Sequence, residues 1–148
     1  GKRGDVLPFS LGKSVYRLLQ YPLQYLNCAA QSPVLYINMH SHNAPSPNEW
    51  MIQNLHDHWE KAVIPGRFSI GIHPWYIEGT GQEQLRQLEQ WSTHPHVLAI
   101  GECGLDKVCG TDFSLQQLVF TGQIRLANSI QKPLVIHCVR AWEEVFSL

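Results

Sequence analysis

Short apolar runs alternate with longer amphipathic segments along most of this chain. The apolar runs predict four buried strands, at residues 34–39, 67–72, 97–101 and 133–136. Apolar residues at helical spacing predict helices at residues 47–62, 82–91, 114–130 and from 141 onward. Strands that are apolar throughout and separated by helices are typical of a parallel sheet covered by helices. The pattern therefore predicts an α/β fold, either a doubly wound sheet or a β/α barrel.

The first part of the chain does not follow this alternation. Residues 1–32 contain four basic residues but one acidic residue, and Pro22 follows a helix-like patch at residues 14–20. No recognisable chemistry falls in this segment. We therefore treat residues 1–32 as an N-terminal extension of unknown role and residues 33–148 as the domain that carries the alternating pattern.

Composition and charge narrow the classes of partner. The 148 residues are 44% hydrophobic, enough for one domain with a real core. The formal net charge of -1 gives no bulk attraction to nucleic acid or to an anionic membrane. A substrate that carries phosphate must therefore be held by local groups and not by a basic surface.

The cysteines and the apolar runs indicate the cellular compartment in which we expect the protein. Cys28, Cys103, Cys109 and Cys138 form no Cys-x-x-Cys pair, which fits a reducing environment. No stretch approaches the roughly 18 apolar residues that a membrane span requires. We expect a cytoplasmic protein with no membrane partner.

Residues with metal-binding or catalytic chemistry end all four predicted strands. In β/α barrels the active site is built at the carboxyl ends of the strands. Because alternate residues of a strand face the same way, the two histidines of the first strand should project together. The residues at the strand ends are His40 and His42, His73, Glu102 and His137.

These residue types suit a divalent metal centre. Imidazoles and a carboxylate bind Zn, Mn, Fe or Ni, and a carboxylate can bridge two cations, as in phosphodiester hydrolysis. Glu102 is the natural bridge, whereas His73 is expected beside the metals or against substrate. Asp106 and Lys107 follow Glu102 in the chain and either contact substrate or pair with each other.

Four other histidines are interpreted as bystanders. His56 and His58 fall on the predicted helix at 47–62, where residues two apart do not face each other. His94 and His96 precede the third predicted strand, at the end of a barrel opposite the active site.

The chain resembles the TatD family of metal-dependent hydrolases, which are β/α barrels of TIM type. The resemblance runs from residue 34 to residue 142 in the family's order. The matching segments are His40-Ser41-His42, Gly71-Ile72-His73-Pro74, Ala99-Ile100-Gly101-Glu102-Cys103-Gly104-Leu105-Asp106, the helix with Gln116, Phe120, Gln123, Leu126 and Ala127, and Lys132-Pro133-Leu134-Val135-Ile136-His137.

The resemblance implies hydrolysis of phosphodiester bonds, typically by a deoxyribonuclease that acts from DNA 3′ ends with two divalent metal ions, Mg, Mn or Zn. Carried over to this chain, the metal ligands are His40, His42, Glu102 and His137. Glu102 and His73 are the implied catalytic residues, and Asp106, Lys107 and Arg140 the implied substrate contacts.

The chain also departs from the family pattern. The segment between His42 and His73 is short, as if a helix and a strand had been lost. Lys107 stands where an aromatic residue is usual, and Val139 replaces an arginine, with Arg140 one place later.

The length is the largest departure. A complete barrel takes about 250 residues, whereas this chain offers about four βα units. The family's further histidine and its aspartate follow the fourth-strand histidine and are not found. We expect an incomplete site that binds metal weakly with little turnover, and self-association through an exposed barrel edge.

Two other functions remain open. The same metal centre could hydrolyse an amide or ester of a small molecule, since fold and ligands do not fix the substrate. Alternatively, the chain is a non-catalytic remnant or interaction module that keeps the ligand residues.

Overall fold

The computed structural model describes residues 36–148. The expectations for residues 1–32, including the helix-like patch and Cys28, lie outside the described residues, as do positions 34 and 35 of the first predicted strand. The assignment of 1–32 as a separate extension therefore stays a prediction.

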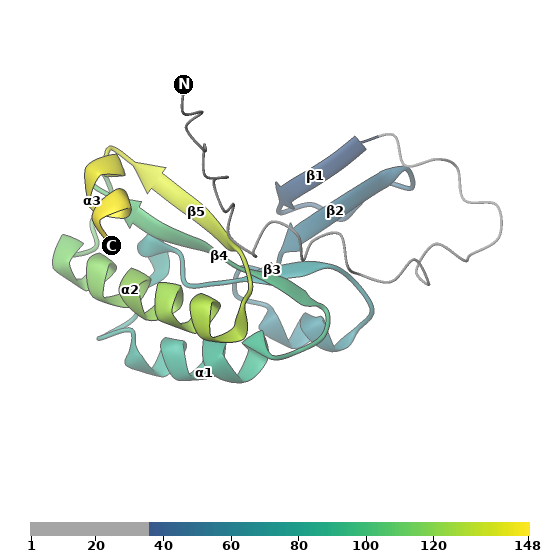
Figure 1. Ribbon diagram of the computed structural model, residues 1–148, viewed down its shortest axis with the longest axis horizontal. Coiled ribbons are helices and arrows are strands. Elements are labelled where there is room, and N and C mark those ends of the chain that lie inside the picture. Colours follow the sequence, from purple (N-terminus) through teal and green to yellow (C-terminus); the bar gives the residue numbers. More distant parts are fainter. Residues whose placement is uncertain (1–35) are drawn as a thin grey trace, which may run out of the picture. The chain divides into compact units, whose positions relative to one another are not determined.

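Five parallel strands form one sheet in the order β1-β2-β3-β4-β5 (Figure 1). Each strand therefore pairs with the next one along the chain, as in a β/α barrel. The predicted parallel α/β fold of TIM type is confirmed, with one strand more than expected. The strands are β1 (Tyr36–Ser41), β2 (Glu49–Asn54), β3 (Phe68–Ile70), β4 (Val97–Asp106) and β5 (Leu134–Val139).

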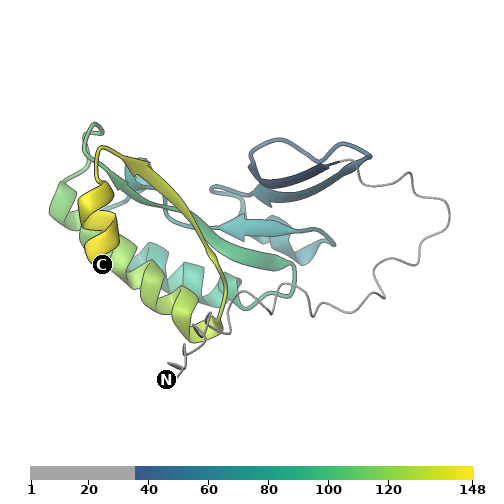
Figure 2. The same ribbon diagram turned by 45° about the horizontal axis from the view of Figure 1, so that its top comes forward.

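The longer helices pack side by side on one face of the sheet (Figures 1 and 2). The helices are α1 (Gln82–Ser92), α2 (Phe113–Ile130) and α3 (Trp142–Ser147), with short 3-10 turns η3 (Trp59–Val63) and η4 (Pro74–Tyr76). Ile70 and Ile100 from the strands are buried in one core cluster with Leu88 of α1 and Val119 of α2. This core leaves the opposite face of the strands to carry the polar residues described below.

The helix predicted at 47–62 is wrong. The segment forms β2 and then η3. Met51 and Ile52 are both buried, and β2 pairs with β1 on one side and with β3 on the other. A position between two strands satisfies the backbone groups on both edges, which overrides the helical spacing of the apolar residues.

The short segment between His42 and His73 therefore retains its strand. What it lacks is a helix between β1 and β2, which are joined by residues 42–48 alone. Parallel neighbours usually need a crossover of a dozen or more residues, commonly a helix that covers the sheet. Ile37 and Met39 of β1 are 67% and 49% exposed, as expected where no crossover helix covers them.

The other predicted elements are close to the observed ones. The helices at 82–91 and 114–130 match α1 and α2 to within one residue at each end. However, β4 continues to Asp106 and β5 to Val139, so Glu102 and His137 lie within their strands and not at the ends.

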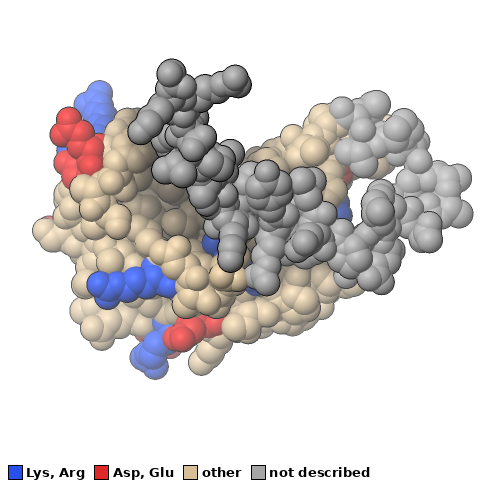
Figure 3. All heavy atoms as spheres, viewed as in Figure 1, with Lys and Arg blue, Asp and Glu red and all other residues tan. Residues whose placement is uncertain are grey.

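Charged side chains of the described residues are visible on the face drawn in Figure 3. Lys and Arg side chains lie apart from one another there, interspersed with Asp, Glu and uncharged residues (Figure 3). Among residues 36–148, no helix has both the length and the apolar character needed to cross a bilayer.

Candidate metal centre

The site is built around the alternation of side chains along β4. Glu102, Gly104 and Asp106 are two residues apart, so they share one face of the strand, while Cys103 and Leu105 point into a core cluster with Phe120 of α2. Gly104 is the register partner of His137 on β5. It has φ +148°, and an added Cβ would collide with the carbonyl oxygen of His137. A glycine here lets β5 approach closely and leaves the His137 ring between two carboxylates.

The His137 ring contacts both of these carboxylates. Its Nδ1 lies 3.1 Å from Oε1 of Glu102, and its Nε2 lies 3.0 Å from Oδ2 of Asp106. His73 follows β3, and its Nε2 lies 3.2 Å from Nδ1 of His137 and 3.9 Å from Oε1 of Glu102.

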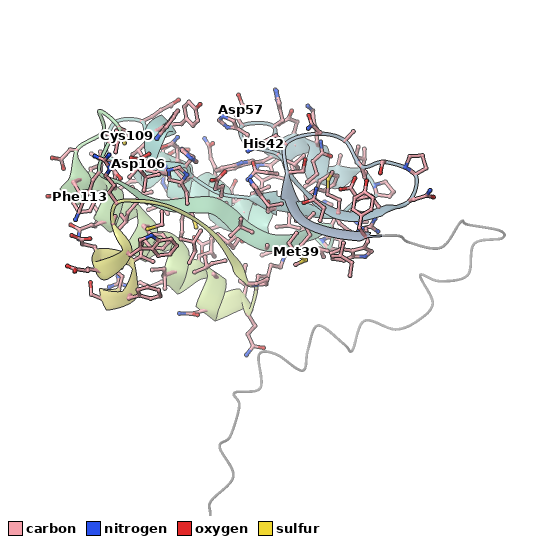
Figure 4. The ribbon with its side chains drawn as sticks, turned by 90° about the horizontal axis from the view of Figure 1, so that it is seen from above. Met39, His42, Asp57, Asp106, Cys109 and Phe113 are labelled. Carbon is pink, nitrogen blue, oxygen red and sulfur yellow. The ribbon has the colours of Figure 1, made fainter. Side chains whose placement is uncertain are left out.

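His40 of β1 and His42, which directly follows β1, reach the other oxygen of the same carboxylate. His40 Nε2 and His42 Nε2 lie 3.3 and 3.6 Å from Oε2 of Glu102. Figure 4 shows His42 on the β1 side of the molecule and Asp106 on the opposite side, toward Cys109 and Phe113. The structure thus brings together the five residues for which the sequence predicted metal or catalytic roles.

These five side chains form two groups of potential metal ligands. His40, His42 and Glu102 make one group, and His73, Glu102 and His137 make the other, with the ligand atoms of each group within 4.8 Å of one another. Nδ1 of His40 is also buried without a hydrogen-bond partner. Imidazole nitrogens with a shared carboxylate are a donor set that suits divalent transition metals, so the residues fit a pair of cations.

His73 is held in the neutral form that metal binding requires. Burial, followed by the neighbouring His137, lowers the pKa of His73 to about 4. At neutral pH its ring therefore carries no positive charge that would repel a cation.

Asp106 is buried and occupied by hydrogen bonds within the protein. Its Oδ2 accepts a bond from Nε1 of Trp75 at 2.6 Å besides facing His137, and its Oδ1 accepts bonds from the backbone N–H groups of Val108 and Cys109. Burial alone would raise the pKa of Asp106, but the bonds from Trp75, His137 and these amides outweigh it and lower the pKa to about 2. An ionised carboxylate of this kind fixes the orientation of a histidine ring.

Two buried glutamines of α2 connect the helix to the site. Gln123 donates to the carbonyl of Ile72 at 3.0 Å and accepts from its N–H at 2.7 Å, just before His73. Gln116 makes the equivalent pair of bonds with the backbone of Asp106. The helix thus fixes the positions at which two site-bearing strands end.

The remaining predicted substrate contacts lie away from these ligands. Lys107 Nζ pairs with Oε1 of Glu144 at 2.5 Å, and Arg140 is exposed after β5. Neither residue lines the cavity of about 230 Å³ beside the ligands. The lining residues are His42, Asn54, His56, Gly71, His73, Trp75, Tyr76, Glu102 and His137.

Five of these lining residues were not predicted as site residues: Asn54, His56, Gly71, Trp75 and Tyr76. The wrong helix assignment hid His56, which follows β2 and so reaches the same edge as His73. Trp75 and Tyr76 come directly after His73-Pro74, a signal that was visible in the sequence. His58, His94 and His96 do not line the cavity, and the last two precede β4 as expected.

The chain is similar in sequence to several known proteins. The chain is 40% identical over 96 residues to the human 3′-5′ RNA nuclease TATDN2, which covers 61% of this chain and 12% of that protein. It is 43% identical over 70 residues to an uncharacterised metal-dependent hydrolase of Buchnera aphidicola, with 47% and 26% covered. It is 38% identical over 73 residues to the 3′-5′ ssDNA/RNA exonuclease TatD of Cronobacter turicensis, with 47% and 27% covered.

The fold has a counterpart among solved structures. The crystal structure of YjjV, a TatD homologue from Escherichia coli K12, superposes with a TM-score of 0.59 at 21% identity and covers 74% of this chain and 53% of that one. The chain therefore spans about half of that structure, and a smaller share of the curated relatives. The family of TatD related DNases matches residues 26–148, and this chain belongs to it.

Proposed function

We propose that this chain carries the metal centre of a phosphodiesterase that acts on nucleic acid from the 3′ end. The observation that carries the proposal is the position of Glu102, whose two carboxylate oxygens each face a separate pair of histidines. A bridging carboxylate between two cations is the arrangement that in-line phosphodiester hydrolysis uses. The names of the nuclease relatives support nucleic acid as the substrate.

Each ligand residue has one proposed role. His40 and His42 would hold one divalent cation and His73 and His137 the other, with Glu102 shared between them. When bound, the cations supply positive charge to the phosphate and lower the pKa of a coordinated water. Mg, Mn and Zn all remain candidates.

The other predicted site residues either orient a metal ligand or lie outside the cavity, where they would contact the substrate. Asp106 orients the His137 ring, because its buried carboxylate faces Nε2 of that ring. Lys107 and Arg140 would meet phosphates that lie outside the cavity, since both follow strands whose ends border the site. Because Glu144 neutralises Lys107, Arg140 is the stronger of the two as a phosphate contact.

The first experiment measures metal uptake. Protein stripped of metal and titrated with Mn²⁺ should bind two ions, and Glu102→Gln should bind at least tenfold more weakly, because it weakens both donor groups at once. Glu89→Gln, at an exposed position of α1, is the matched control and should bind like the unmodified chain. No uptake by the unmodified chain would favour a non-catalytic protein.

The second experiment identifies the bond that is cleaved. Single-stranded DNA and RNA labelled at the 5′ end should be shortened slowly from the 3′ end in the presence of Mn²⁺, because the sequence predicts an incomplete ligand set with little turnover, and Glu102→Gln should abolish this residual shortening. Cleavage of small amides or esters with no cleavage of either nucleic acid would contradict the proposal and favour an amidohydrolase.

We also propose a cytoplasmic location. Cys103, Cys109 and Cys138 are free thiols in the structure, which fits a reducing compartment.

A further inference from the structure

Two large aromatic side chains lie exposed beside the candidate metal centre. Trp75 and Tyr76 belong to η4, directly after His73, and are 56% and 49% exposed. Both line the cavity that also contains Glu102 and His137. Aromatic rings in such a position cover apolar area that a ligand can bury.

The Trp75 ring is held in one orientation. Its indole N–H donates to Oδ2 of Asp106 at 2.6 Å, and its backbone N–H donates to Nδ1 of His73 at 3.2 Å. The indole and the His73 ring meet edge to face, with centroids 5.5 Å apart and an interplanar angle of 85°. A ring fixed in this way loses little conformational freedom when a ligand stacks on it.

A second pair of rings extends the same surface. The centroids of His56 and Tyr76 lie 4.5 Å apart with an interplanar angle of 38°, and the Tyr76 ring lies 5.6 Å from that of His73. His56 has φ +50°, and its N–H donates to Oδ1 of Asn54 at 2.7 Å. The rings of His56, Tyr76 and Trp75 thus form an aromatic wall along the cavity.

We propose that this aromatic wall is a stacking subsite for the nucleobase next to the scissile phosphate. The inference rests on the proposed function and adds to it the protein surface that would bind an unstacked base at a single-stranded end. Aromatic side chains bind bases through their π-faces, largely without regard to sequence. In a duplex, each base is already stacked on its neighbours. Stacking on the aromatic wall therefore adds no binding free energy unless the end of the duplex unwinds.

The geometry also relates base binding to the metal ligands. Oδ2 of Asp106 is shared between Trp75 Nε1 and His137 Nε2. A base stacked on Trp75 therefore lies against the same hydrogen-bonded unit that orients His137. This places the subsite next to the phosphate that the two donor groups would hold.

The test measures binding for each combination of substrate variant and protein variant, as in a double-mutant cycle. The probe is a phosphorothioate-linked single strand with fluorescein at its 5′ end, and its binding is followed by fluorescence anisotropy with Mn²⁺ present. The strand carries either a normal or an abasic residue at the 3′-terminal or the penultimate position. In the unmodified chain, the abasic residue should weaken binding about tenfold. The matched blunt duplex should bind at least tenfold more weakly than the single strand.

Two variants separate the ring from its hydrogen bond. Trp75→Phe and Trp75→Leu both lack the indole N–H, but only Trp75→Phe keeps an aromatic ring. The abasic penalty is the factor by which the abasic residue weakens binding. It should persist in Trp75→Phe, whereas in Trp75→Leu it should be less than twofold. Trp142→Leu, at an equally exposed tryptophan of α3 outside the cavity, should keep the full penalty.

The outcomes distinguish this inference from the proposed function. An abasic penalty in Trp75→Leu equal to that of the unmodified chain, or equal binding of duplex and single strand, overturns the stacking subsite and leaves the phosphodiesterase proposal intact. Failure of the unmodified chain to bind or cleave any oligonucleotide, despite Mn²⁺ uptake, overturns the nucleic acid substrate itself.

Discussion

Glu102 and His137 show how single residues define this site. Each oxygen of Glu102 faces different histidines, and His137 lies between Glu102 and Asp106. Such an arrangement gives each residue two partners, so the effects of substitutions at the site should not be additive.

The lowered pKa of His73 predicts a pH dependence of stability without metal. Because the folded pKa is about 4 and the ordinary value 6.5, the unfolded chain takes up the proton first as the pH falls. The free energy of unfolding should be highest above pH 6.5 and should decrease toward pH 4, by roughly 1–3 kcal/mol. Urea unfolding of the metal-free chain at pH 7.5 and pH 5 measures this.

His73→Gln should remove most of that decrease. His58→Gln, at an exposed histidine that lines no part of the cavity, is the control and should keep it. Asp106 does not interfere, because its pKa lies near 2 and its own contribution is lost only below about pH 4. If His73→Gln leaves the decrease in the free energy of unfolding between pH 7.5 and pH 5 unchanged, another group is responsible for it.

At the scale of elements, α2 positions the site through its buried glutamines. Gln116 and Gln123 lie seven residues apart on one face of the helix, and each satisfies both backbone groups of a residue near a strand end. The sequence indicated an amphipathic helix here, but not that two of its buried residues would be polar.

Gln123→Leu should destabilise the protein although leucine fits the apolar core. The change leaves the buried N–H and C=O of Ile72 without partners, which costs about 1–3 kcal/mol for each group. Gln90→Leu, on the exposed side of α1, is the control and should lie within about 0.5 kcal/mol of the unmodified chain. Chemical denaturation measures both, and equal midpoints would contradict the role assigned to Gln123.

The close approach of β4 and β5 gives a second prediction for these elements. Gly104→Ala should lower the free energy of unfolding by about 3 kcal/mol or more, because φ +148° is strained for alanine and the added Cβ meets the His137 carbonyl. Gly110→Ala, where an added Cβ meets nothing within 4 Å, should be close to neutral. If Gly104→Ala does not fold, its soluble yield relative to Gly110→Ala reports the same difference; equal stability and yield would contradict the prediction.

At the scale of the whole molecule, the site connects strands that are far apart in the sheet. His40 lies in β1 and His42 directly follows it, whereas Glu102 and His137 come from β4 and β5. A cation held by such residues stabilises the folded state, because the unfolded chain cannot bring them together.

Metal should therefore raise the melting temperature. At Mn²⁺ concentrations of 100 times the Kd, the expected stabilisation is about 2.7 kcal/mol, which corresponds to a shift of several degrees. Glu102→Gln should abolish most of the shift, and Glu89→Gln should not change it. A shift of the same size in Glu102→Gln would show that the cation binds elsewhere.

The sheet edges bear on assembly. In the described part of the chain, β1 pairs with β2 alone and β5 pairs with β4 alone. Open edges are templates for pairing with another chain. The self-association expected from the sequence stays a prediction, to be checked by light scattering over a range of concentrations.

The sequence by itself determined the parallel α/β class, the helices at 82–91 and 114–130, and the candidate ligands, because these follow from local periodicity and from residue chemistry at the ends of apolar runs. It could not determine that residues 49–54 form a strand, since that depends on neighbours provided by β1 and β3. Nor could it place Trp75 on Asp106 or His56 in the cavity. Only the tertiary structure decided these contacts, because they join segments whose spacing in the chain carries no information about their distance in space.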